Sequence, residues 1–315
     1  MLIRKAMKSF LHNAHPFLQI IVTLSSMFVV YFILLFVGLI IGLIFTGKGL
    51  EEFYALLQQP VGPENIRYLK FLQTLQGIGM FLLPPFLVAW LIHPKPFDFL
   101  SLNKHPKLYS FIATGILIIL ALPLINYMVK LNALLHLPES FSGIENWMLE
   151  KEKAAEKLIG AFLEADNIGT FSFNLFMIAI IPAVGEELTF RGILQPVLSR
   201  WCRSRHWGVF ITAIAFSAMH MQFYGFLPRF ALGVLFGYLL IWSKSLWLPI
   251  LAHFINNAFA VGVYYFWGQA GEKQLEEIGA SEGTIISLMI SIVGVIILLY
   301  TIYRSEKLYR GLLGK

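Results

Sequence analysis

FSFNLFMIAIIPAVGEELTFRGIL, residues 171–194, is apolar enough to cross a lipid bilayer, yet it carries two adjacent glutamates, Glu186 and Glu187. No other member of the chain's 18 acidic residues falls inside a predicted membrane span. A carboxylate at membrane depth costs at least about 2.5 to 3.5 kcal/mol. This pair is therefore the first place in the chain to look for chemistry.

The composition around this stretch is that of a polytopic membrane protein. The 315 residues are 57% hydrophobic and only 13% charged, with a mean hydropathy of +0.72, whereas a soluble domain is about a quarter charged. The first apolar run, residues 16–46, follows Arg4, Lys5 and Lys8 as a signal peptide would. It is too long for one and has no small-residue cleavage site, so it predicts a retained helix.

Eight segments approach the roughly 20 apolar residues that a membrane helix needs. The sequence therefore predicts an all-α bundle of about eight transmembrane helices. We expect one transmembrane domain over residues 1–315, with a motif-bearing catalytic core at 171–260 inside it. The predicted spans are 17–46, 71–92, 108–129, 171–195, 207–224, 226–243, 246–267 and 283–303.

The distribution of basic residues favours both termini in the cytoplasm. With that orientation the cytoplasmic segments hold 14 Lys and Arg and the outer segments nine, while Arg191 lies within a span. An excess on the cytoplasmic side is the usual bias of membrane proteins. The net charge of +6 is spread over short loops, which argues against a nucleic-acid partner. The lipid bilayer is the expected partner.

The longest outer connection, residues 130–170, contains an amphipathic pattern. Its apolar residues recur at helical spacing at positions 155, 158, 159, 162 and 163. We expect a helix that lies on the membrane surface or caps the bundle, with structural packing as the default role and substrate gating as the alternative. A shorter helix is expected at residues 50–57.

Two of the eight histidines fall inside predicted spans. His220 lies in the fifth span and His253 in the seventh, where Asn257 follows it by four residues and so shares its helix face. Counted from the predicted cytoplasmic turns, Glu186 and His220 have similar depth. A single buried histidine is usually a packing residue, but two together with a buried diglutamate favour a functional site.

The two glutamates are expected to have different roles. Glu187 and Arg191 stand four residues apart, which allows a salt bridge along the helix. Two adjacent carboxylates do not both ionise cheaply at low dielectric. We therefore expect Glu187 and Arg191 to support the site, and Glu186 to face the histidines.

Two chemistries fit this set of residues. In the first, Glu186 deprotonates a water that attacks a carbonyl, and a histidine orients the water or protonates the leaving amine. In the second, Glu186, His220 and His253 hold a hydrolytic zinc ion with an open fourth position. Asn257 would donate to the developing oxyanion in both. Other protease chemistries have less support, because Cys202 lies among loop arginines and Ser217 has no evident partners.

Three strings in order along the chain resemble the CAAX protease and bacteriocin-processing (CPBP, or Abi) family of intramembrane proteases, which is related to the type II CAAX prenyl endopeptidases. They are Glu186-Glu187-x-x-x-Arg191, Phe216-x-x-x-His220 and His253-x-x-x-Asn257. The resemblance covers roughly residues 171–260. It implies that Glu186, His220, His253 and Asn257 are catalytic and that Glu187 and Arg191 are supporting residues.

The resemblance implies an endopeptidase of a bacterial inner membrane that acts on a small hydrophobic or lipidated peptide or protein. The family has been described both as metalloproteases and as glutamate proteases. We favour water activated by Glu186 with no cofactor, and zinc is the alternative. Two other functions stay open: a proton-coupled transporter, since buried Glu and His also build proton relays, and a non-catalytic bacteriocin-immunity or scaffold protein.

Overall fold

The fold is all-α, as the sequence predicts. A computed structural model describes residues 11–58, 62 and 65–313, and that part of the chain contains helices and no strand. Seven of its helical segments are long and apolar enough to cross a membrane. The basic residues Arg4, Lys5 and Lys8 lie outside the described residues. The chain is an integral membrane protein.

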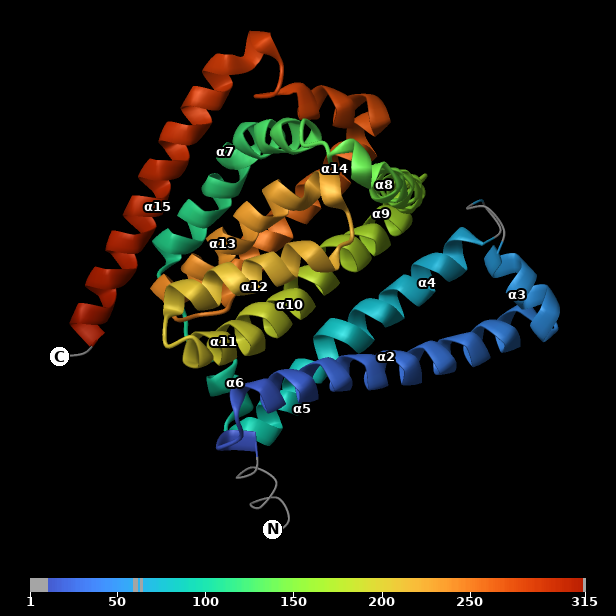
Figure 1. Cartoon of the computed structure of the whole chain (residues 1–315), viewed down its shortest axis with the longest axis horizontal. Coiled ribbons are helices and arrows are strands. Elements are labelled where there is room, and N and C mark those ends of the chain that lie inside the picture. Colours follow the sequence, from blue (N-terminus) through green and yellow to red (C-terminus); the bar gives the residue numbers. More distant parts are fainter. Residues whose placement is uncertain (1–10, 59–61, 63–64, 314–315) are drawn as a thin grey trace.

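The helices follow one another with short connections (Figure 1). Two long spans each contain several helical pieces joined without a break, Ile66–Ile92 and Ile168–Trp201. The α-helices are α2 (Pro16–Thr46), α3 (Leu50–Gln58), α4 (Ile66–Gly77), α5 (Leu83–Ile92), α6 (Pro96–Phe99), α7 (Leu108–Ala133), α8 (Ser142–Leu163), α9 (Ile168–Asn174), α10 (Ile181–Glu187), α11 (Gln195–Trp201), α12 (Arg205–Met219), α13 (Phe226–Ser243), α14 (Trp247–Glu277) and α15 (Ile285–Leu313). Short helices of other types are η1 (Ile78–Leu82), η2 (Glu139–Phe141), η3 (Leu175–Ile180), η4 (Leu188–Leu194), η5 (Phe223–Gly225) and η6 (Glu282–Thr284).

The predicted span at 207–224 differs most from the structure. Its helix, α12, has 15 residues and ends at Met219, so it rises only about 22 Å and is not among the seven segments of membrane-spanning length. Met221 has a positive φ of 52°, and the chain reverses there into η5 and α13. α12 lies beside α13 (Figure 1). His220 is therefore at the end of a helix rather than inside one.

Three π-helical segments interrupt the spans, and each ends two residues before a proline. η1 precedes Pro84, η3 precedes Pro182, and η4 precedes Pro196. Proline has no N–H and crowds the carbonyl four residues earlier, and a π-bulge is one way for a helix to accommodate this change. A side chain of a neighbouring helix supplies one of the missing donors. Thr189 Oγ1 donates to the Phe81 carbonyl, which Pro85 leaves without its usual partner, at 3.2 Å.

The loops that were predicted to share a side of the membrane lie at the same end of the bundle. At one end Arg200 donates to Gln19 Oε1 at 2.7 Å, and Ser245 donates to the Lys104 carbonyl. At the other end Asn126 donates to the Leu275 carbonyl at 2.7 Å. The connections therefore alternate between the two ends of the bundle, and which end faces the cytoplasm stays a prediction.

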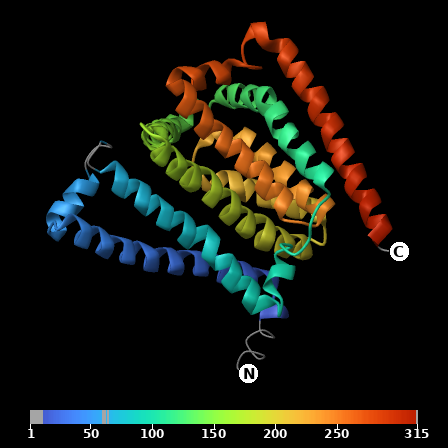
Figure 2. The ribbon, with the colours of Figure 1, turned by 180° about the vertical axis from the view of Figure 1, so that it is seen from behind.

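α7 and α15 form one edge of the bundle and α2 lies at the other (Figures 1 and 2). Glu306 of α15 is buried and accepts hydrogen bonds from the Lys107 backbone N–H at 3.1 Å and from Ser110 Oγ at 2.5 Å. Its carboxylate thus lies at the N-terminus of α7, where a helix favours negative charge. This contact joins α15 to α7 at one end of both helices.

The predicted amphipathic helix is α8, and the predicted shorter one is α3. α8 buries Phe162 and Leu163 at its C-terminal end and passes across the end of the bundle near α9 and α14 (Figure 1). It reaches the turn after α12 through Trp147, whose ring centroid is 5.6 Å from that of Phe223. α8 is therefore packed against the elements that carry the candidate site.

Candidate active site

A buried chain of charged groups crosses from α10 to α14. Arg191 Nη1 donates to Glu187 Oε1 at 2.8 Å, and both side chains are fully buried. The same oxygen lies 3.0 Å from His253 Nδ1. The predicted pairing of Glu187 with Arg191 is present, and Glu187 has a second role that the spacing did not predict, because it also holds His253.

Arg191 is enclosed by residues of two other helices, α12 and α13. Its Nη2 donates to the Gly233 carbonyl of α13 at 3.0 Å. Its guanidinium carbon lies 4.5 Å from the centre of the Phe216 ring and 5.3 Å from that of Phe236. A cation desolvated between aromatic faces gains from their quadrupoles. The guanidinium therefore fixes α10, α12 and α13 around the site.

The contact with Glu187 determines how His253 presents its ring. A carboxylate oxygen only accepts, so Nδ1 carries a proton and donates it to Glu187. In the neutral imidazole, Nε2 then keeps its lone pair. The ring stacks on Phe236 at 5.4 Å between centroids, which holds its plane. Nε2 points toward Glu186, with 3.9 Å between it and Glu186 Oε2.

Glu186 is the less restrained of the two carboxylates. Its side chain is 12% exposed, against 0% for Glu187, and its buried Oε2 has no hydrogen-bond partner among the described residues. The 3.9 Å gap to His253 is too long for a direct hydrogen bond, but one water can bridge it. Glu186 therefore has the geometry expected of a group that acts on a small molecule between itself and His253.

His220 lies on the same side of the site. Its Nδ1 is 2.9 Å from the Phe216 carbonyl, which only accepts, so Nε2 is again the nitrogen with the lone pair. The Phe216 ring contacts both imidazoles, with centroids 5.2 Å from His220 and 5.9 Å from His253. The structure thus places His220 and His253 against the same aromatic ring, and Glu186 lies 3.9 Å from His253.

Asn257 is also near this group but is already engaged. Its Nδ2 donates to the Ile178 carbonyl at 3.1 Å, and its Oδ1 accepts from Asn256 at 3.2 Å. Pro182 stands four residues after Ile178 and has no N–H for that carbonyl. Asn257 therefore satisfies a backbone group that the proline leaves free, and one of its two amide hydrogens remains for another acceptor.

The described residues contain no group of three His, Cys, Asp or Glu side chains placed to hold a metal ion. Glu186, His220 and His253 are the right types of donor for zinc. In this arrangement His253 Nε2 and Glu186 Oε2 lie side by side but the third donor does not converge with them. The donor set as folded does not fit zinc, so we derive no catalytic step through a metal.

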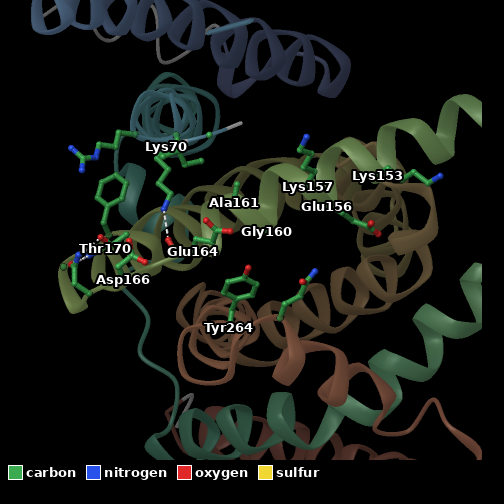
Figure 3. Close-up of a pocket in the computed structure, with 17 residues that line it drawn as sticks. Lys70, Lys153, Glu156, Lys157, Gly160, Ala161, Glu164, Asp166, Thr170 and Tyr264 are labelled. Carbon is green, nitrogen blue, oxygen red and sulfur yellow. Dashed lines mark hydrogen bonds between the residues drawn. The ribbon is translucent and has the colours of Figure 1, made fainter. Parts of the chain in front are cut away.

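A polar cavity of about 1310 Å³ lies elsewhere, between α4, α8 and α14 (Figure 3). It contains none of the predicted site residues. Lys70 points into it and donates to Asn174 Oδ1 at 2.8 Å and to the Glu164 carbonyl at 3.3 Å. Tyr264, which also lines the cavity, is 11 residues after His253 on α14, about 16 Å along the helix. The cavity is at the opposite end of α14 from its predicted cytoplasmic turn.

The fold and the site define a polytopic all-α membrane protein in which a buried Glu-Arg pair orients a histidine toward a second glutamate. Residues 168–259 match the family described as type II CAAX prenyl endopeptidase Rce1-like. All three motifs lie in this segment, so the match confirms the resemblance predicted from them.

Two curated relatives are bacterial. The membrane-embedded CAAX protease MroQ of Staphylococcus aureus (strain USA300) is 29% identical over 109 residues, which are 33% of this chain and 44% of that protein. The uncharacterized protein YpbD of Bacillus subtilis (strain 168) is 28% identical over 89 residues, 27% of this chain and 42% of that protein. The matched part thus spans less than half of each relative. No solved structure matches the chain significantly.

Proposed function

We propose that this protein is an intramembrane endopeptidase that hydrolyses a peptide bond with a water activated by Glu186. The observation that carries the proposal is the approach of Glu186 Oε2 to within 3.9 Å of His253 Nε2, with His253 held from behind by Glu187. Glu186 Oε2, which has no hydrogen-bond partner among the described residues, and His253 Nε2, which has a lone pair, then face the same point. A water at that point has two acceptors for its protons.

The reaction follows from these positions. Glu186 takes a proton from the water while the water oxygen forms a bond to the carbonyl carbon of the substrate. The remaining amide hydrogen of Asn257 donates to the oxyanion that develops. The proton then passes to the amide nitrogen, from Glu186 or from a histidine that has taken it up, and the C–N bond breaks. The products are a carboxylic acid and an amine, and the site is regenerated.

The substrate class that we propose is a small hydrophobic or lipidated peptide or protein. It rests on the resemblance to membrane-embedded proteases and on the depth of the site in an apolar bundle. A proton-coupled transporter is the second candidate, because unpartnered buried carboxylates beside histidines also occur in proton relays. Ion flux in proteoliposomes that depended on Glu186, in a protein without proteolytic activity, would favour it. A scaffold or immunity role would instead survive Glu186→Gln.

The test is cleavage of a library of hydrophobic peptides by protein purified in detergent, read by mass spectrometry. We expect cleavage products that are absent from matched preparations of His220→Ala, and full activity after chelation, with no stoichiometric zinc by elemental analysis. Equal product from the wild type and the variant would contradict the endopeptidase. Zinc that is lost together with activity would instead support the metal-dependent alternative.

For the location, we propose a bacterial cytoplasmic membrane with both termini in the cytoplasm. Cys202 is the chain's single cysteine and is exposed in the turn between α11 and α12, at the end predicted to face the cytoplasm. A membrane-impermeant maleimide should therefore label it in inside-out vesicles and leave it unlabelled in spheroplasts. A Cys202→Ser chain is the control for background. The reverse pattern would invert the topology.

A further inference from the structure

Arg229 extends the site beyond the residues that the sequence singled out. It lies in the first turn of α13 and is half-buried. One of its terminal nitrogens donates to the Gln222 carbonyl at 3.1 Å, and the other donates to Gln222 Oε1. Gln222 is two residues after His220, in the turn where the chain reverses. The guanidinium is thus tied to the segment that directly follows a candidate catalytic histidine.

The positive charge of Arg229 is not matched by a contact partner. No carboxylate among the described residues lies within 4.0 Å of it. Glu152 of α8 and Glu186 interact with it only at longer range. A guanidinium has five N–H donors, and the two bonds to Gln222 leave three of them available.

The local fold makes room for this guanidinium. Gly225 lies directly under it, and a Cβ at that position would meet three of its atoms closer than side chains normally approach. A partly desolvated guanidinium with free donors is suited to bind a carboxylate through two parallel hydrogen bonds. An acidic group near the site would otherwise be repelled by the Glu186 carboxylate.

We propose that Arg229 binds a carboxylate of the substrate next to the scissile bond and so makes the enzyme select acidic or free C-terminal peptides. The inference rests on the proposed endopeptidase and names a feature of its substrate. Arg229 is a specificity-determining residue in this view. If it served only to brace the turn at Gln222, its loss would lower stability and would slow acidic and neutral substrates equally.

The experiment compares paired peptides that differ only in charge. In some pairs one member has Asp and the other has Asn at a single position, which lies before the cleaved bond in some pairs and after it in others. In a further pair one member has a free C-terminus and the other an amidated one. We expect kcat/KM of the wild type to favour the acidic member of at least one pair by roughly 10- to 100-fold, as for hydrogen bonds to a charged group. Arg229→Gln should bring that ratio close to one, and Arg229→Lys should restore part of it.

Two further variants separate binding from folding. Gly225→Ala keeps the guanidinium but displaces it, so it should reduce the ratio without removing the charge. Arg67→Gln removes an exposed arginine that lines the distant cavity and should leave the ratio at the wild-type value. A wild-type ratio near one, or an unchanged ratio in Arg229→Gln, overturns this inference and leaves the endopeptidase standing. A wild type that cleaves no peptide overturns both.

Discussion

Glu186→Gln should lower the rate of peptide cleavage by at least about a hundredfold, because a positioned general base contributes about 10² to 10⁴. The fold should be unaffected. Glu186 Oε2 has no hydrogen-bond partner in the part of the chain that the structure describes, so the amide loses no hydrogen bond there and removes a buried charge. Cleavage is measured on a peptide that the wild type processes, and stability by thermal unfolding in the same detergent.

The matched control for this variant is Glu156→Gln, which makes the same chemical change at the distant polar cavity. We expect it to keep wild-type activity. If Glu186→Gln retained more than about a tenth of the wild-type rate, well above the range for a lost general base, Glu186 would not be the base. Loss of activity together with loss of the folded state would instead make Glu186 a structural residue.

Arg191→Met should destabilise the folded protein by about 3 to 5 kcal/mol, the usual cost of removing one partner of a buried ion pair. The substitution leaves the Glu187 carboxylate without its cation and the Gly233 carbonyl without its donor. We expect a large fall in the unfolding midpoint in detergent and a low yield of folded protein. Arg205→Met, at an exposed position, is the control and should unfold like the wild type.

The double variant Glu187→Leu/Arg191→Met distinguishes charge burial from packing. Replacing both members of a buried pair by apolar side chains is often neutral, so much of the lost stability should return. Cleavage should not return, because His253 would lose the oxygen that fixes its Nδ1 proton. A double variant that regained activity would show that Glu187 does not orient His253.

The sequence predicts the parts of this protein that depend on hydrophobic length and helical spacing. Seven of the eight predicted spans are segments of membrane-spanning length, and the pairing of Glu187 with Arg191 is present. The end of α12 was not predictable in the same way. The apolar pattern continues past Met219, and only the φ of Met221 shows that the helix stops there.

The hydrogen bonds between different helices of the site could not be predicted from the sequence either. The spacing leaves Glu187 with one partner, whereas the fold gives it His253 as well, from 66 residues further along the chain. Asn257 was predicted from its helix face, but its bond to Ile178 depends on a carbonyl of another helix. The prolines are the one sequence feature that points to such bonds, because each proline in a span leaves a backbone carbonyl that needs a new donor.

The hydrogen bond from Asn257 to the Ile178 carbonyl links the backbone structure of one span to the candidate site. The same side chain compensates a break in the backbone and, in the proposed reaction, offers its second hydrogen to the oxyanion. Pro182 and Asn257 are therefore linked through this one carbonyl. If Pro182 were exchanged for alanine, a backbone donor would compete for that carbonyl, and the amide would become free to rotate away from the orientation that the proposed reaction requires.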